Sequence, residues 1–182
     1  MSMFSLRYSA PPMLAAALAC GAAVLPAVAS AQAASSAAAH ARTPTADDPA
    51  LRAFFGNARV AGGDAADTLL ARMVGAMATP ADGDPASRAR AVGDGLVLQT
   101  GCRERACDEA GAVVYDADAG VVLVAGLIHR NCGAATTSCD GTPTLTVFHS
   151  SRRQAPMPAL VALDDWAEAQ VPDIARTMQP LP

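Results

Sequence analysis

The sequence predicts an α+β fold, in which an antiparallel β-sheet of meander topology has helices packed on one face. Apolar residues at helical spacing occur near both ends of the chain, over residues 47–79 and 158–172. Between them, over residues 95–150, short runs rich in Val, Leu and Ile are separated by turn-forming residues. Short turns join neighbouring strands in antiparallel pairs, and helices on either side of such a block cover the sheet.

Residues 1–33 are expected to form a secretory signal peptide, removed on export to the periplasm. Arg7 is the only charge before Arg42, and the small, apolar run that follows Arg7 ends in "AVASAQA". A membrane-spanning helix fits less well, because Pro26 interrupts the apolar run. A lipoprotein acylated at Cys20 is a further alternative, although the preceding "ALA" is a poor lipobox.

Residues 34–46 are small and polar and show no periodicity, which predicts a disordered linker before a single domain over 47–182. In "DDPALRAFFG", either Asp can cap a short helix that begins at Pro49. In "GGDAADTLLARMVGAMATP", the spacing of Leu and Met predicts a second helix, capped by Asp64 and stopped by Pro80.

The polar stretch "ADGDPASRARAVG" is expected to be a loop, and four strands should follow it. They are predicted in "GLVLQTGC", "AGAVVYDAD", "GVVLVAGLIH" and "GTPTLTVFHS". The "DADAG" between the second and third of these predicts a hairpin turn. A last helix is predicted in "PALVALDDWAEAQVP", ending before Pro172.

The charge balance argues against nucleic acid as a partner. The chain has no Lys, and after residue 33 twelve Arg face seventeen acidic residues, a net charge near −5. Nucleic-acid binders carry basic patches, so this chain suits a basic partner instead.

After removal of Cys20, four cysteines remain, an even number that predicts two disulfides in an oxidising compartment. Three pairings are possible. Proximity in sequence favours Cys102–Cys107 and Cys132–Cys139, and a crossed pairing stays open. The spacings C-x4-C and C-x6-C do not match the paired C-x2-C of zinc ribbons, and no C-x-x-C redox motif occurs. We therefore expect neither a metal nor another cofactor.

The sequence also lacks the G-x-S-x-G and H-E-x-x-H motifs and a phosphate-binding Gly loop, so we do not expect an enzyme. His40 lies in the predicted linker, while His129 and His149 lie at predicted strand ends. An enzyme would require one of these two histidines beside a carboxylate in a polar pocket.

The most specific segment is "CRERAC", residues 102–107, where Arg103, Glu104 and Arg105 lie between two cysteines. A disulfide here can be a structural staple that fixes a turn before a strand. It would also present a rigid, cationic tip that loses little ordering entropy on inserting into an acidic cleft.

This segment resembles the hallmark loop of the inhibitor of vertebrate lysozyme (Ivy) family, Cys-Lys-Pro-His-Asp-Cys. The cysteine spacing matches, as do the following "GAVVYDADAGVVLVAGL", the entry strand "GLVLQTGC" and the helix "DAADTLLARMVGAM". The similarity is specific over residues 64–129 and loose beyond. It implies the family's fold, suggests a homodimer, and implies insertion of the Cys102–Cys107 loop into the cleft of a C-type lysozyme.

The loop departs from the family at each position between its cysteines. Arg103 replaces Lys, Glu104 replaces Pro, Arg105 replaces the His that reaches the catalytic carboxylates, and Ala106 replaces Asp. A guanidinium can also bridge carboxylates, and Arg103 can offset the charge of Glu104. We therefore expect an exported lysozyme inhibitor. The alternative is an envelope binding or structural module that keeps the fold and no longer binds lysozyme.

Overall fold

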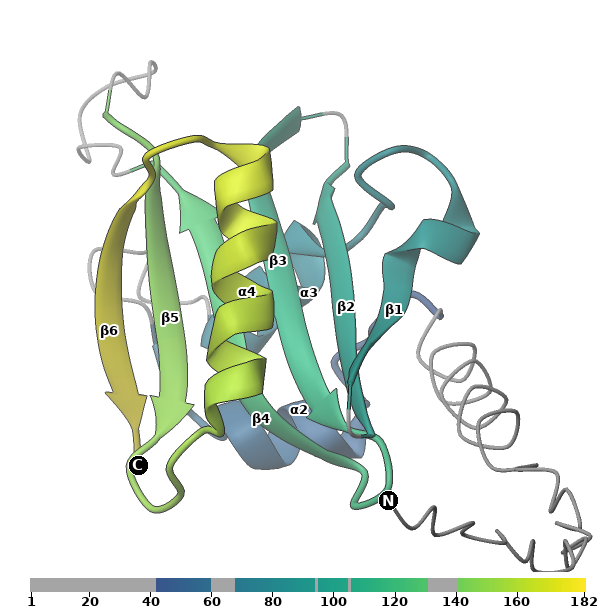
Figure 1. Cartoon of the computed structure of the whole chain (residues 1–182), viewed down its shortest axis with the longest axis vertical. Coiled ribbons are helices and arrows are strands. Elements are labelled where there is room, and N and C mark those ends of the chain that lie inside the picture. The colour runs from purple at the N-terminus through teal and green to yellow at the C-terminus, as the bar shows by residue number, and fades with distance from the viewer. Residues whose placement is uncertain (1–41, 60–67, 94, 105, 131–140) are drawn as a thin grey trace, which may run out of the picture.

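The computed structural model describes residues 42–59, 68–93, 95–104, 106–130 and 141–182, and it confirms the α+β class. Its strands form one six-stranded sheet in sequential order from β1 to β6 (Figure 1). The strands are β1 (Ala89–Gly93), β2 (Leu96–Arg103), β3 (Ala106–Asp116), β4 (Val121–His129), β5 (Thr144–Ser150) and β6 (Ala175–Leu181). The helices are α2 (Pro49–Phe55), α3 (Leu69–Ala76) and α4 (Met157–Gln170), with a 3-10 turn at Pro85–Arg88.

The first five strands form the predicted antiparallel meander, and the "DADAG" hairpin joins β3 to β4 as expected. Two strands were missed. β1 lies at the end of the stretch predicted as a polar loop. β6 follows α4 and pairs in parallel with β5, so α4 is the crossover between them. Both are edge strands with largely exposed side chains, which explains why hydrophobic periodicity did not reveal them.

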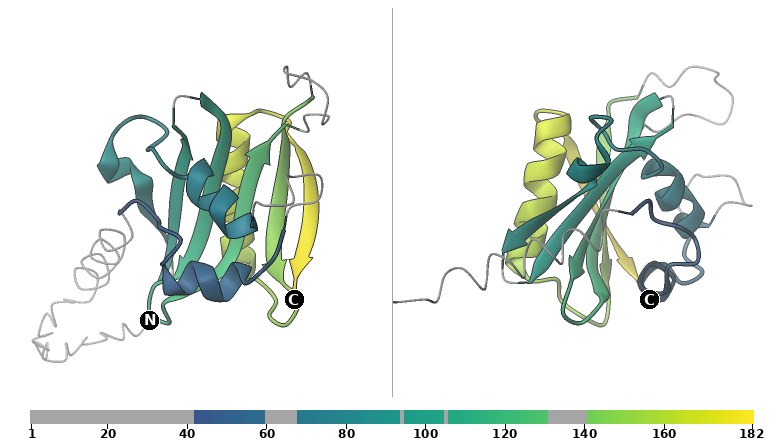
Figure 2. Two further views of the ribbon diagram at one scale, coloured as in Figure 1. Left: turned by 180° about the vertical axis from the view of Figure 1, so that it is seen from behind. Right: turned by 90° about the vertical axis from the view of Figure 1, so that its right-hand side faces the viewer.

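The prediction that the helices share one face is wrong. α2 and α3 cover one face of the sheet, whereas α4 covers the other (Figure 2). In the central strands consecutive residues are buried, as at Val113 and Val114 of β3 and at Val124 and Ala125 of β4. Strands that are apolar on both sides need cover on both sides. The unbroken apolar run "VVLVAGLI" carried this information.

The helix starts follow local capping. Asp48 accepts hydrogen bonds from the amides of Ala50 and Leu51, at 2.9 and 3.2 Å, as predicted for α2. The predicted cap of α3, Asp64, lies outside the described residues. Thr68 caps this helix instead, with its Oγ1 accepting from the Ala71 amide.

The end of the predicted linker belongs to the folded part of the chain. The carbonyl of Arg42 accepts a hydrogen bond of 2.6 Å from Nε2 of the buried Gln99 on β2, and Pro44 is buried. Residues 34–41 and the predicted signal peptide lie outside the described residues. No helix of the described part of the chain is long and apolar enough to cross a membrane.

The segment after α3 approaches the sheet so closely that glycine is required beneath it. A Cβ on Gly101 would lie 2.8 Å from the carbonyl oxygens of Met77 and Thr79. A Cβ on Gly111 of β3 would lie 2.7 Å from the Met77 side chain. The two glycines let residues 77–79 lie directly on β2 and β3, next to the loop that follows Gly101.

We predict that Gly101→Ala destabilises the fold by about 1–3 kcal/mol, because the added methyl group meets backbone atoms that cannot rotate away. The measurement is the free energy of unfolding in urea. Gly75→Ala is the matched control: nothing lies within 4 Å of its Cβ position inside α3. Relief of the helix penalty of glycine should make that variant more stable, by about 0.5–1 kcal/mol. Equal stability of the two variants would contradict the close approach.

Candidate functional site: the loop closed by Cys102 and Cys107

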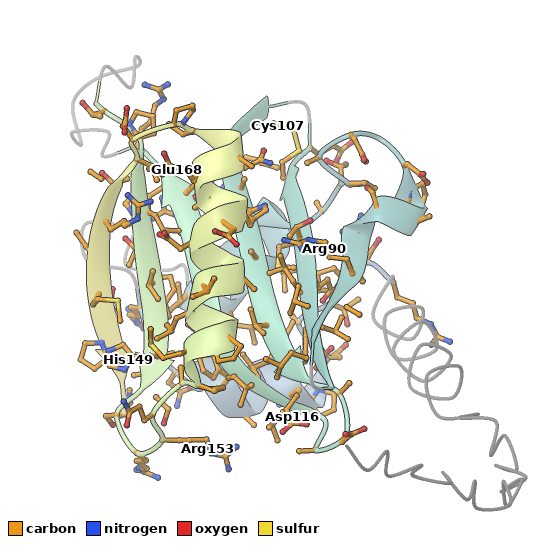
Figure 3. The ribbon with its side chains drawn as sticks, viewed as in Figure 1. Arg90, Cys107, Asp116, His149, Arg153 and Glu168 are labelled. Atoms are coloured by element: carbon orange, nitrogen blue, oxygen red, sulfur yellow. A yellow bond between two sulfur atoms is a disulfide. The ribbon has the colours of Figure 1, made fainter. Side chains whose placement is uncertain are left out.

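The candidate site is the tip of the β2–β3 hairpin, at one end of the sheet. Cys102 and Cys107 are joined by a disulfide with a Cα–Cα distance of 5.0 Å. Cys102 is buried and Cys107 is exposed, so the disulfide connects the core to the tip of the hairpin (Figure 3). Arg103 and Glu104 are exposed. The register shifts between Cys102 and Arg103, which turns the tip out of the regular ladder.

The base of the loop is held by the chain that follows α3. The amide of Cys102 donates to the carbonyl of Thr79 at 2.8 Å, and the amide of Thr79 donates back at 3.0 Å. The Thr79 hydroxyl also donates to the carbonyl of Cys102, at 3.1 Å. These bonds add a short bridge at the end of β2, where β1 no longer pairs with it.

A buried arginine holds this bridging segment in turn. The Arg88 guanidinium donates to the carbonyl of Met77 at 2.5 Å and to that of Ala78 at 3.2 Å. Burial lowers the pKa of Arg88, but an arginine starts so far above neutrality that it stays charged. Its charge-assisted bonds satisfy carbonyls at the end of α3 that have no partner within the helix.

Glu109 connects the loop to α3 by ion pairs. Its Oε1 accepts from Nε of Arg72 on α3 at 2.6 Å, and its Oε2 pairs with Nη2 of Arg103 in the loop. The side chains are 13 % exposed for Glu109, 22 % for Arg72 and 48 % for Arg103. The innermost group of the three is thus an anion between two cations. This arrangement restrains the first basic residue of the loop.

His129 on β4 lies on the same face of the sheet as Glu109 and continues the polar contacts toward β5 and β6. Its Nε2 lies 2.8 Å from Oγ1 of Thr146 on β5, which lies 3.1 Å from Oγ1 of Thr177 on β6. Burial lowers the pKa of His129, and the positive charge of Arg72 lowers it further. The nearby Glu109 carboxylate and a backbone hydrogen bond at Arg130 oppose the shift. The neutral imidazole is therefore favoured in the folded protein.

The structure brings some of the predicted site residues together and leaves others undescribed. Cys102, Arg103, Glu104 and Cys107 meet at the hairpin tip, and Ala106 begins β3. Arg105 and the second cysteine pair, Cys132 and Cys139, lie outside the described residues. His129 and His149 lie at opposite ends of the sheet, and Nδ1 of His149 is 3.3 Å from the carbonyl of Ser150.

Sequence reasoning missed Glu109 and Arg72. They are 37 positions apart, and neither lies in a motif. The one local signal was the position of Glu109, an acidic residue two positions after Cys107. It lies on the face of β3 that carries the buried Val113. Within the described residues, no three His, Cys, Asp or Glu side chains are grouped to hold a metal ion.

Comparison of the chain with protein-family models, with curated proteins and with solved structures finds no match.

We predict that Glu109→Gln lowers the free energy of unfolding by about 1–3 kcal/mol, because the partly buried guanidinium of Arg72 and the exposed one of Arg103 both lose their counter-charge. The measurement is urea denaturation, with hydrogen exchange of the loop amides as a second readout. Glu168→Gln is the matched control, since Glu168 also pairs with an arginine, Arg176, at 2.7 Å, but on the exposed surface. That variant should keep nearly the parent's stability. Equal losses in the two variants would contradict an anchoring role of Glu109.

We further predict that His129 makes the fold less stable in acid. Because the folded protein disfavours the imidazolium, its pKa lies below the ordinary 6.5 of the unfolded chain. The unfolded chain then binds more protons, so stability is full above that value and falls as the pH drops through the folded pKa. His129→Gln should flatten this slope, measured by urea denaturation across the acid range. His149→Gln should retain it, and an unchanged slope in His129→Gln would contradict the assignment.

Proposed function

We propose that this protein is an exported inhibitor of a C-type lysozyme, which inserts the Cys102–Cys107 loop into the active-site cleft. The observation that carries the proposal is the construction of the loop. A disulfide closes it, the Thr79 bridge holds its base, and Glu109 restrains Arg103. A loop that is already ordered loses little conformational entropy when it enters a cleft.

The chemistry of the target supports the same reading. A lysozyme cleft presents two carboxylates, at least one of them ionised, so it favours a cationic tip. Since Arg103 is engaged by Glu109, the charge proposed to face these carboxylates is that of Arg105. The resemblance to the Ivy family assigns this role to Arg105, in the place of that family's His. The net negative charge of the chain would speed its encounter with a basic lysozyme.

Purified protein lacking residues 1–33 should slow the lysis of a sensitive cell wall by C-type lysozyme at near-stoichiometric amounts. Unimpaired lysis at a large molar excess would refute inhibition. Size measurement of the free protein and of the mixture would report the complex, and also the homodimer that the family resemblance suggests.

Within this proposal, Arg105→Ala should be the most damaging single change. It removes the guanidinium proposed to pair with buried carboxylates, a truncation that typically costs about 2–5 kcal/mol of binding. Arg103→Ala should cost less, because its charge is partly exposed and already paired with Glu109. Surface plasmon resonance against immobilised lysozyme measures both. An unchanged affinity of Arg105→Ala would remove this residue from the tip of the plug.

The disulfide should matter for binding more than for folding. Replacing Cys102 and Cys107 by Ser should weaken lysozyme binding, mainly by faster dissociation, while far-ultraviolet circular dichroism keeps the signal of the sheet and helices. The staple closes only a short loop, so its effect on the unfolded chain is modest. Raised salt should instead slow association of the parent protein. A double variant that binds as tightly as the parent would show that preorganisation of the loop is irrelevant.

The alternative proposal is an envelope module with the same fold and another ligand. The engagement of Arg103 by Glu109 favours it, because this pair lowers the free positive charge of the loop. It predicts a folded protein without affinity for lysozyme, one that captures another envelope component from periplasmic extract. Capture of lysozyme-like enzymes alone would contradict it.

A further inference from the structure

A groove lies at the end of the sheet opposite the disulfide loop. It has a volume of about 510 Å³, within the range of small-ligand sites. α2 provides one wall through Ala53 and Phe54, and the start of β4 provides the floor through Val122, which packs in the same cluster as α2. Val121 and Leu123 also line the groove, but they belong to the cluster on the α4 side of the sheet. Since β3 runs from the loop to this end, the groove and the loop are separated by the length of a strand. Figure 3 shows Cys107 and Arg153 at the two ends.

Two adjacent arginines, Arg152 and Arg153, line the groove beside Ser150. Both are exposed. The turn that carries them is fixed, because the amide of Arg152 donates to Ser150 Oγ at 3.1 Å and the amide of Ser151 donates to the carbonyl of Leu181 at 2.8 Å. The groove therefore presents its cationic rim without the cost of ordering a loose loop.

These two guanidinium groups differ from four other arginines of the chain, which are paired with carboxylates. Arg52, Arg72, Arg103 and Arg176 each form an ion pair with an acidic side chain. Over the residues that the structure describes, Arg152 and Arg153 form none. In the hairpin turn that brings Gly120 to the groove, the Asp116 carboxylate accepts hydrogen bonds from the amides of Asp118 and Ala119, at 3.1 and 2.9 Å. In a chain with more acidic than basic residues, an unmatched pair of cations beside an apolar floor points to an anionic ligand.

We propose that the groove binds a single-chain anionic amphiphile, such as a fatty acid. The acyl chain lies against Ala53, Phe54 and Val122, and the carboxylate meets Arg152 and Arg153. The planar donor fork of a guanidinium suits a carboxylate. An extended acidic peptide fits less well, because β4, which forms the floor, is already hydrogen-bonded to β3 and to β5. It has no free edge for the backbone of a peptide.

The test is a titration of the ¹⁵N-labelled protein with dodecanoate below its micellar concentration, followed by NMR, with calorimetry for the affinity. We expect saturable binding of one molecule, with shifts centred on Ala53, Val121 and Arg152. Acetate, which lacks the chain, and dodecyltrimethylammonium, which has the opposite charge, should each bind at least tenfold more weakly.

Substitutions in the groove test where the ligand binds, and they leave the Cys102–Cys107 loop unchanged. Arg152→Gln and Arg153→Gln should each weaken dodecanoate binding by about two- to fivefold, as expected for an exposed ion pair. Arg90→Gln, an exposed arginine on β1, is the matched control and should bind like the parent. Ala53→Gln adds bulk on the exposed face of α2 and should obstruct the groove without unfolding the helix.

Several results would overturn the proposal. The first is an absence of binding up to the micellar limit, and the second is an equal loss in Arg90→Gln. Shifts that appear on raising the protein concentration alone would assign the groove to a second copy of the chain. Binding to vesicles of anionic phospholipid but not to monomeric dodecanoate would assign it to a membrane surface. Lysozyme inhibition does not enter any of these measurements, so the two proposals fail separately.

Discussion

The close contact between residues 77–79 and the end of β2 is the constraint on which the candidate site depends. It depends on Gly101 and Gly111 beneath it, because a Cβ at Gly101 would meet backbone atoms of the segment and a Cβ at Gly111 would meet the Met77 side chain. It lets Thr79 exchange backbone hydrogen bonds with Cys102, and the buried Arg88 holds it by hydrogen bonds to the carbonyls of Met77 and Ala78. The disulfide thus starts from a residue whose backbone is already fixed. Closure of the loop extends this order to the exposed Arg103, Glu104 and Cys107.

Electrostatics around the loop follow from burial rather than from sequence neighbours. The loop sequence alone suggests that Arg103 offsets the charge of Glu104, which is adjacent to it. In the folded protein Arg103 pairs with Glu109, which also holds Arg72 of α3. A carboxylate that is largely removed from water needs cations around it, and the sheet supplies one while the helix supplies the other. The loop is therefore connected through Glu109 to the sheet and through Arg72 to α3.

The sequence was sufficient for the elements whose apolar pattern is complete, and insufficient where an element contributes little to the core. The bounds of β2, β4, β5 and α4 were close to prediction because buried residues mark them, whereas β3 begins at Ala106, before the predicted run that starts at Ala110. β1 and β6 are edge strands with mostly exposed side chains, so their pairing partners, not their own sequences, define them. The two-sided cover of the sheet was readable from β4, where consecutive residues are buried. The ion pairs of Glu109 were not readable, since they join residues that only the fold brings together.

An arginine and a histidine would act differently at the tip of such a loop. A histidine titrates near neutral pH, so an inhibitor that depends on imidazolium loses charge as the pH rises. A guanidinium stays charged at every physiological pH, and its fork can engage both oxygens of a carboxylate. If Arg105 faces the catalytic carboxylates, the affinity should follow the ionisation of the target and not that of the inhibitor. The pH profile of binding then reports the lysozyme, whose carboxylates lose the arginine as a partner only when acid protonates them.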